Sequence, residues 1–198
     1  MRPTRLIPVA VLALAVAACS DTTTSPTSVG GPLFAVSPGT FGNVTTLNAG
    51  GTPSGGHIQS GGPINCVVGS DLSVTCSGSG SYQINGIGNT NGNASLSATY
   101  SATVDCTNKG GNLVEVKSQA SSGPASTGTL RAKNGSITVP QISTSTPSNS
   151  AFFAQATCPN GNWTKSLAGG SATLESFTYT LTFVGFSTPA VSITDQSL

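Results

Sequence analysis

The sequence ASLSATYSATVDC, residues 94–106, alternates small or apolar side chains with polar ones from end to end. Successive side chains of a strand point to opposite faces of a sheet, so this alternation predicts a strand with one buried face. That face would carry Leu96, Ala98, Tyr100, Ala102, Val104 and Cys106. No comparable helical period appears after the N-terminal segment. The stretch therefore predicts an all-β fold.

Two other segments repeat the period of two. In residues 176–183 one face would carry Phe177, Tyr179, Leu181 and Phe183. In residues 152–158 a third strand is predicted, with its inward face at Phe152, Ala154, Ala156 and Cys158.

Turn residues separate the predicted strands. Asn134-Gly135 lies between residues 129–133 and 136–139, and an Asn-Gly pair favours a tight hairpin because both positions tolerate positive φ. Further turns are predicted at residues 108–112 and 159–162. This spacing predicts an antiparallel sandwich of about seven to nine strands over residues 62–198. A domain of that length can bury a core.

Four of the five cysteines fall on the inward faces of the predicted strands, namely Cys66, Cys76, Cys106 and Cys158. Buried, paired cysteines are typical of structural disulfides in an oxidising compartment. Three pairings are possible. Cys66 with Cys76 and Cys106 with Cys158 is favoured, because ten residues suit a local hairpin and the longer loop joins distant strands. The spacings lack the C-x-x-C pairs of zinc sites, so no metal or other cofactor is expected.

The N-terminal residues 1–18 have the order of an export signal. A basic start with Arg2 and Arg5 precedes an apolar run over residues 6–16 and then two alanines. The run is shorter than the roughly 20 residues that cross a bilayer as a helix. We therefore expect a signal peptide that is removed.

Val16-Ala17-Ala18-Cys19 resembles the lipobox of bacterial lipoproteins, an aliphatic residue and two small ones before a cysteine. The resemblance implies that Cys19 carries lipid, that the chain is cut before it, and that the partner is a membrane. An odd number of cysteines favours this, because lipid on Cys19 leaves four to pair. Ser20 in place of Asp favours the outer membrane in a cell with two membranes. The alternative is ordinary secretion after cleavage at Ala15-Val16-Ala17.

Residues 19–61 are rich in Thr, Ser, Gly and Pro, a composition typical of a flexible linker. Two apolar islands interrupt it, at residues 33–36 and 44–47, and either can add an edge strand to the domain that follows.

Cys106-Thr107-Asn108 with Gly110-Gly111-Asn112, and Cys158-Pro159-Asn160 with Trp163, resemble motifs of small secreted bacterial β-sandwich proteins without an assigned function. The resemblance implies an immunoglobulin-like sandwich and no activity. Trp163 lies after the last cysteine, whereas antibody-type domains place a Trp between the paired cysteines. A core or disulfide-packing role is expected for Trp163, and a ligand platform is the alternative.

Catalytic chemistry is hard to assemble from these residues. The only histidine, His57, lies in the Gly-rich segment, and no serine has a G-x-S-x-G elbow. The acidic residues are Asp21, Asp71, Asp105, Glu115, Glu175 and Asp195, and their spacing selects no hydrolase pair. Loss of Arg2 and Arg5 leaves five basic residues against six acidic ones, too few to bind nucleic acid. We expect no enzyme.

Ser and Thr occupy much of the predicted outward faces, as in the row Thr178, Thr180 and Thr182. Such a row can present hydroxyls to a ligand, although Thr also favours strands for its shape alone. The leading hypothesis is a surface-displayed, lipid-anchored module that binds a glycan, a polymer or a protein. The alternatives are a self-associating structural protein of the envelope and a carboxylate-dependent hydrolase.

Overall fold

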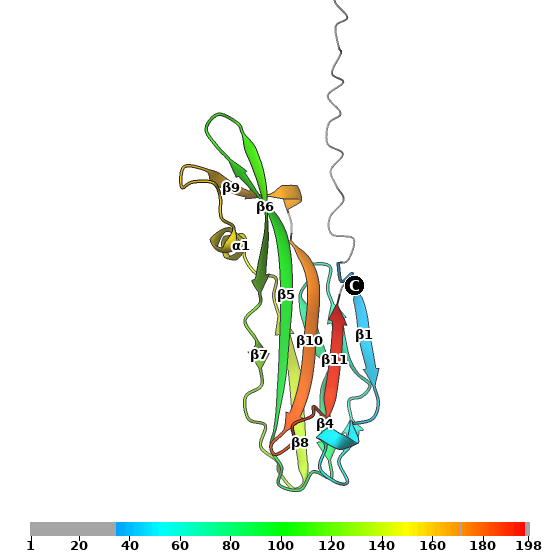
Figure 1. Ribbon diagram of the computed structural model, residues 1–198. Coiled ribbons are helices and arrows are strands. Elements are labelled where there is room, and N and C mark those ends of the chain that lie inside the picture. The colour runs from blue at the N-terminus through cyan, green and yellow to red at the C-terminus, as the bar shows by residue number, and fades with distance from the viewer. Residues whose placement is uncertain (1–34, 171, 197–198) are drawn as a thin grey trace, which may run out of the picture. The chain divides into compact units, whose positions relative to one another are not determined.

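The structure is a computed structural model that describes residues 35–170 and 172–196. These residues belong to one compact unit, Pro32–Leu198. The predicted signal peptide and Cys19 lie outside the described residues. The described part is all-β, with one short helix and two antiparallel sheets (Figure 1).

The five-stranded sheet contains β1 (Gly39–Val44), β2 (His57–Ser60), β3 (Ile64–Val68), β4 (Val74–Asn85) and β8 (Ser136–Thr144). The six-stranded sheet contains β5 (Gly92–Thr107), β6 (Leu113–Ser121), β7 (Ala125–Ser126), β9 (Thr164–Leu167), β10 (Thr173–Phe183) and β11 (Val191–Gln196). The helix α1 (Asn149–Gln155) and the short 3-10 turns η1 (Ala49–Gly51) and η2 (Ala168–Gly170) complete the described elements.

Strand β5 organises the six-stranded sheet. β10 and then β9 pair along one side of β5, and β6 and β7 pair along the other. β2 and β3 likewise pair with successive parts of β4. Nine of the described strands, β3 to β11, lie within residues 62–198, in agreement with the seven to nine predicted there, and the other two, β1 and β2, come from the predicted linker. The antiparallel, sandwich-like architecture is as predicted, and its immunoglobulin-like identity stays a prediction.

The inward faces of the two sheets form one buried core, and the inward rows predicted for residues 94–106 and 176–183 are confirmed on β5 and β10. Every apolar residue predicted to face inward on β5 is at most 6% exposed, and on β10 the aromatic row and Leu181 are at most 1% exposed. Complete burial of a Leu or Phe side chain contributes about 1.5–3 kcal/mol. Alternation is therefore a reliable signal here, because one face of each strand supplies the core.

One polar contact crosses the middle of this core. The hydroxyl groups of Tyr82 on β4 and Tyr179 on β10 lie 2.6 Å apart in a buried hydrogen bond. Burial raises the pKa of Tyr179 to about 12. Burial, and then the neighbouring Tyr179, raise the pKa of Tyr82 well above its ordinary value. Each phenol thus satisfies the other, and neither ionises readily in the folded state.

This pair predicts a loss of stability in alkali. A tyrosine whose folded pKa lies above its unfolded pKa stabilises the fold fully below about pH 10, and this contribution falls as pH rises toward the folded pKa. We expect the free energy of unfolding in urea to fall between about pH 10 and 12, by up to about 1.4 kcal/mol per pH unit for each tyrosine. A variant with Tyr82→Phe and Tyr179→Phe should show a clearly flatter dependence, and an equally steep one would contradict this account.

The predicted strand at residues 152–158 is wrong. Residues Asn149–Gln155 form α1, and Phe152 is its buried residue. Phe152 and Ala156 lie four residues apart and both are buried, so the same apolar pattern also fits one helical turn. Trp163, predicted as a core anchor, is instead half-buried in the turn before β9 and lies outside the core cluster.

The predicted linker, residues 19–61, is too long. β1 pairs with β3, with Phe41 opposite Cys66, and β2 pairs with β4. Val36 is buried, and its backbone N–H donates to Leu174 O on β10. The hydrogen bonds between paired strands use backbone groups only. A Gly- and Thr-rich segment can therefore join a sheet without an apolar pattern. The folded unit therefore includes the residues from 35 onward.

The Asn134-Gly135 turn is present, with φ of 50° and 77°. Its second arm is β8, but its first arm, residues 129–133, makes only isolated bridges: Leu130 with Gly92, and Lys133 with Ser136. The turn at residues 108–112 joins β5 to β6 as predicted.

Candidate binding groove

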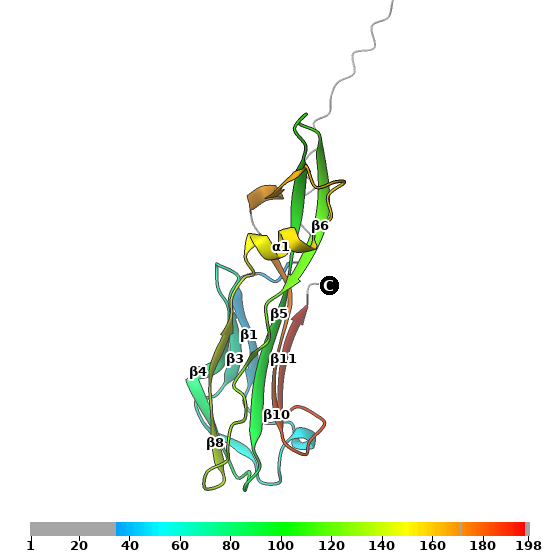
Figure 2. The ribbon, with the colours of Figure 1, turned by 90° about the vertical axis from the view of Figure 1, so that its left-hand side faces the viewer.

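Strands of the six-stranded sheet extend beyond the end of the five-stranded sheet, and a junction forms where the shorter sheet ends. β8 ends at Thr144, whereas β5 and β6 continue, and α1 packs against both of them (Figure 2). A groove of about 460 Å³ lies at this junction. We call it the junction groove. It is lined by Ser121, Ser122, Gly123, Ser143, Thr144, Ser145, Thr146, Pro147, Ser148 and Ala151.

One wall of the junction groove comes from the end of β6. There the chain leaves the ladder with β5, and Ser122 replaces the lost backbone pairing. Its hydroxyl accepts from Ala98 N and donates to Ala98 O, each at 3.2 Å, and its own N–H also donates to Ala98 O. Ser122 is buried. These bonds fix the position of Ser121 and Gly123 on either side of it.

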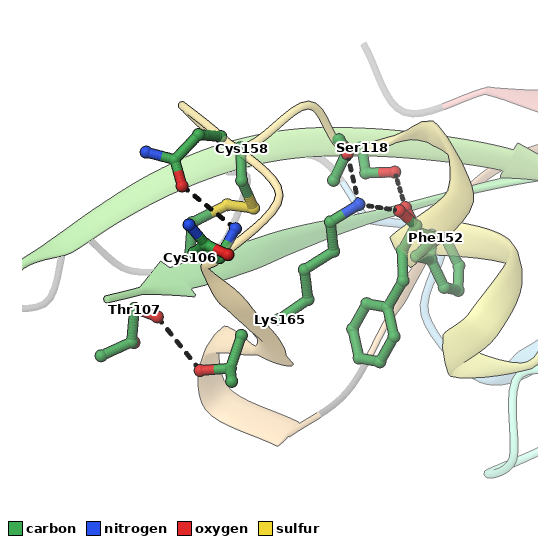
Figure 3. Close-up of a disulfide and its surroundings, with 11 residues drawn as sticks. Cys106, Thr107, Ser118, Phe152, Cys158 and Lys165 are labelled. Carbon is green, nitrogen blue, oxygen red and sulfur yellow. Dashed lines mark hydrogen bonds between the residues drawn. A yellow bond between two sulfur atoms is a disulfide. The ribbon is translucent and has the colours of Figure 1, made fainter. Parts of the chain in front are cut away.

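Ser148 and Ala151, at the start of α1, also line the groove, and several contacts hold the later part of the helix. Ser118 Oγ on β6 donates to Phe152 O at 2.8 Å. Lys165 on β9 donates to Phe153 O at 2.6 Å and to Ala156 O at 2.8 Å, so its ammonium group covers carbonyls at the C-terminal end of the helix (Figure 3). A cation is favourable at that end.

A disulfide also fastens the segment after α1. Cys106 at the far end of β5 bonds to Cys158, with their Cα atoms 5.7 Å apart (Figure 3). Two contacts therefore hold the C-terminal end of the helix. Lys165 binds its carbonyl groups, and the disulfide fixes Cys158 just after it. The position of α1 is therefore set by these contacts as well as by the hydrogen bonds within its own seven residues.

Thr144, the last residue of β8, is one of the residues that line the groove. The residue is 6% exposed, and its Oγ1 has no hydrogen-bond partner among the described residues. A buried hydroxyl without a partner costs about 1–3 kcal/mol. The hydroxyl of Tyr100 lies close by but donates to Leu72 O, at 2.9 Å. Thr144 pairs with the buried Val74, and its shielded hydroxyl lies near enough to Tyr100 to lower the pKa of that phenol, so it belongs to the inward face of β8.

The electrostatics around the groove are weak. Burial raises the pKa of Tyr100, and the hydroxyls of Thr144 and Thr146 partly offset that rise. Thr146 Oγ1 donates to Asp71 O, while the Asp71 carboxylate accepts from the hydroxyl and N–H of Ser73, which lowers the pKa of Asp71. None of the ten lining residues is ionisable. The groove therefore presents hydroxyls without a formal charge.

The four predicted disulfide cysteines form the two favoured pairs. Cys66 bonds to Cys76 directly across β3 and β4, and Cys106 bonds to Cys158. Cys158 reaches its partner from the segment after α1, so its predicted place on a strand is wrong. Two disulfides indicate an oxidising, extracytoplasmic environment. Along the described residues, no helix is long and apolar enough to cross a membrane.

The carboxylates that the sequence left unpaired are now placed. Asp105 on β5 lies opposite Glu115 on β6, on the outward face of the sheet, and its Oδ1 is shielded with no hydrogen-bond partner in the part of the chain that the structure describes. The sequence does contain a signal for this pairing, because counting outward along both strands from the turn at residues 108–112 places residue 105 opposite residue 115. Gln119 donates to Glu175 at 2.7 Å. Asp71 lies in the turn between β3 and β4, Asp195 lies on β11, and Asp21 lies outside the described residues.

The other predicted candidates lie elsewhere. His57 is exposed at the start of β2, with its ring nitrogens near Gly55 O and Gln59 Oε1. Of the predicted row Thr178, Thr180 and Thr182, Thr180 Oγ1 lies 2.9 Å from Ser95 Oγ, and Thr178 Oγ1 accepts from Thr194 Oγ1 at 3.4 Å. Among residues 35–170 and 172–196, no three His, Cys, Asp or Glu side chains gather as a metal site would require.

The groove residues were missed by the sequence analysis. Residues 143–150 read STSTPSNS, a run without apolar period, and such a run is indistinguishable from an ordinary polar loop. No family model, no curated protein and no solved structure matches this chain. A functional assignment therefore depends on the chemistry of its own residues.

Proposed function

We propose that the chain is an exported lipoprotein of the bacterial cell envelope, attached through lipid on Cys19, and that its sandwich-like unit acts as a non-catalytic binding module. The observation that carries the proposal is the use of cysteine. The two disulfides consume four of the five cysteines, which leaves Cys19, at the end of the lipobox, for lipid. In a cell with two membranes, the outer one is the proposed location.

Binding, as opposed to catalysis, is supported by the junction groove. Hydroxyl side chains dominate its lining, and a serine or threonine without an adjacent base is a weak nucleophile. The carboxylate pair Asp105 and Glu115 lies on an outward sheet face, where the register places the two residues opposite each other. A displayed module needs a stable scaffold and a recognition surface, and the disulfide-bonded sandwich with its groove supplies both.

Metabolic labelling tests the anchor. Cells that express the wild-type chain or Cys19→Ala are grown with an alkyne fatty acid, and the protein is then recovered and coupled to a fluorophore. We expect label on the wild type only, and release of the Cys19→Ala protein from the membrane fraction. Ser20→Ala serves as the matched control and should label like the wild type. Equal labelling of wild type and Cys19→Ala would overturn the lipoprotein proposal.

A further inference from the structure

One end of the six-stranded sheet projects as an arm (Figures 1 and 2). β10 begins at Thr173, opposite Ser101, whereas β5 continues to Thr107 and pairs there with β6 and β9. We call this projection, residues 102–118 and 164–167, the arm. At about 3.3 Å per residue it is about 20 Å long, and it ends in the turn at residues 108–112.

The free end of the arm carries exposed apolar side chains. Leu113 and Val114, the first residues of β6, are 55% and 40% exposed. Leu113 and Thr164 both lie opposite Thr107, the last residue of β5, so Trp163 lies one residue further toward the turn. Trp163 is the only tryptophan of the chain and is half-buried outside the core cluster. We call Leu113, Val114 and Trp163, with the turn at residues 108–112, the tip.

The backbone of the turn satisfies most of its own hydrogen-bond donors. Asn108 Oδ1 accepts from Gly110 N and Asn112 N, each at 2.9 Å, Gly111 N donates to Asn108 O, and Asn108 N donates to Asn112 O. Backbone N–H groups that leave water without a partner are costly. A turn whose donors are already bonded can therefore enter a region that is poor in water.

The chain enters the folded unit at the end that carries the arm. Val36 N donates to Leu174 O, at the start of β10, and β1 then runs away from the arm (Figure 1). Ala35 is the sixteenth residue after Cys19, and sixteen residues span at most about 55 Å when fully extended. For the linker composition that the sequence shows, the expected average span is about 22 Å. Lipid on Cys19 would therefore place a bilayer within reach of the tip.

A bilayer surface suits the tip better than a protein partner does. A stable protein interface buries about 800 Å² on each partner, and three apolar side chains beside a Gly-rich turn supply much less. Tryptophan favours the boundary between headgroups and acyl chains, where its ring is shielded and its N–H stays hydrated. Lys109, exposed in the turn, can lay its aliphatic stem along the same boundary and keep its ammonium group in water.

We propose that the arm is a membrane-contacting element, and that its tip rests among the lipid headgroups of the bilayer that holds Cys19. The inference rests on the proposed function, because it names the surface that the anchored unit touches. A contact of this size is weak by itself, but a short tether gives it an effective concentration of about a millimolar. The contact also orients the unit, so that its opposite end, with the Asn134-Gly135 turn, points away from the membrane.

The test couples the chain to vesicles by chemistry. The chain from Cys19 onward is exported behind an unrelated signal peptide so that the disulfides form, and its Cys19 thiol is joined to a maleimide lipid in phosphatidylcholine vesicles. Trp163 reports contact by its fluorescence. We expect its emission to shift to shorter wavelength on coupling, and vesicles with brominated acyl chains to quench it. The same chain with its thiol blocked, mixed with the same vesicles, should be quenched severalfold less.

One tip variant and one matched control locate the contact. The double variant Leu113→Ser and Val114→Ser removes the apolar side chains and keeps Trp163 as the reporter, and we expect most of the quenching to be lost. Val184→Ser removes a valine that is 67% exposed at the opposite end of the unit, just after β10, and should leave the quenching unchanged. All three positions are exposed, so both variants should keep the melting temperature of the wild type.

Several results would overturn the inference. These are an unquenched Trp163 in the coupled wild type, equal quenching in the double tip variant, and an emission shift on concentrating the blocked chain without vesicles, which would show that the tip binds a second copy. Because the lipid is coupled by maleimide, none of these results depends on what cells attach to Cys19. The membrane contact and the lipoprotein proposal can therefore fail separately.

Discussion

Replacement of Cys106 and Cys158 together by alanine is expected to lower the free energy of unfolding by about 4 kcal/mol, as the chain-entropy estimate for a loop of this length gives. The bond closes a loop with a sequence separation of 52 residues. Its removal allows the unfolded chain many more conformations, and it also frees the segment after α1. Urea unfolding followed by tyrosine and tryptophan fluorescence gives the stability.

The second disulfide provides a matched control. Cys66 and Cys76 are only ten residues apart, so the same estimate gives a smaller loss, lower by about 1.5 kcal/mol. The double alanine variant at this pair should leave hydrogen exchange in α1 unchanged, whereas loss of Cys106–Cys158 should accelerate it. A larger loss of stability at Cys66 and Cys76, or unchanged exchange in α1 for the other pair, would contradict the assignment.

Phe152→Ala is expected to lower the free energy of unfolding by about 3–5 kcal/mol, the usual cost of truncating a fully buried phenylalanine. Phe152 is 0% exposed and is the one buried residue of α1. It belongs to the buried core cluster, and α1 packs against β6 and β5. Denaturant unfolding measures the loss.

Phe153 offers a comparison at the next position. It is only half-buried, so Phe153→Ala should cost clearly less than Phe152→Ala. Both variants shorten the same residue type in the same helix, and the difference between them therefore reports burial and not helix propensity. Equal losses at the two positions would show that α1 does not pack as the structure has it.

The long strands could be predicted from the sequence because each has one face in the core. On β5, alternation extends from Ala94 to Cys106, and a register error of one residue would move Tyr100 to the outward face. The need to keep one face of the strand in the core appears in the sequence as strict alternation of apolar and polar residues. The cysteine pairs were predicted from sequence separation, and the pair Cys106–Cys158 forms although Cys158 lies after α1 and not on a strand.

The remaining elements left no comparable pattern. β1 reads GTFGNV and has no buried residue, so its place in the sheet depends on backbone bonds that composition does not reveal. α1 is too short for its helical period to differ from the alternation at Phe152 and Ala156. The junction groove brings together residues 121–123 and 143–151, which lie on separate segments, and only the tertiary fold places them at one junction.

The way the chain enters the fold determines how the unit would bear tension from a membrane anchor. A pull on the residues before Ala35 reaches Val36 first, whose N–H is bonded to Leu174 O on β10, and then the ladder between β1 and β3. Those hydrogen bonds can open one after another. At Phe41 the ladder lies beside Cys66, and the covalent bond to Cys76 ties β3 to β4. Because this bond joins β3 to β4 and not β1 to β3, a pull from the proposed anchor could detach β1 and then β2 before it reached a covalent crosslink at Cys66.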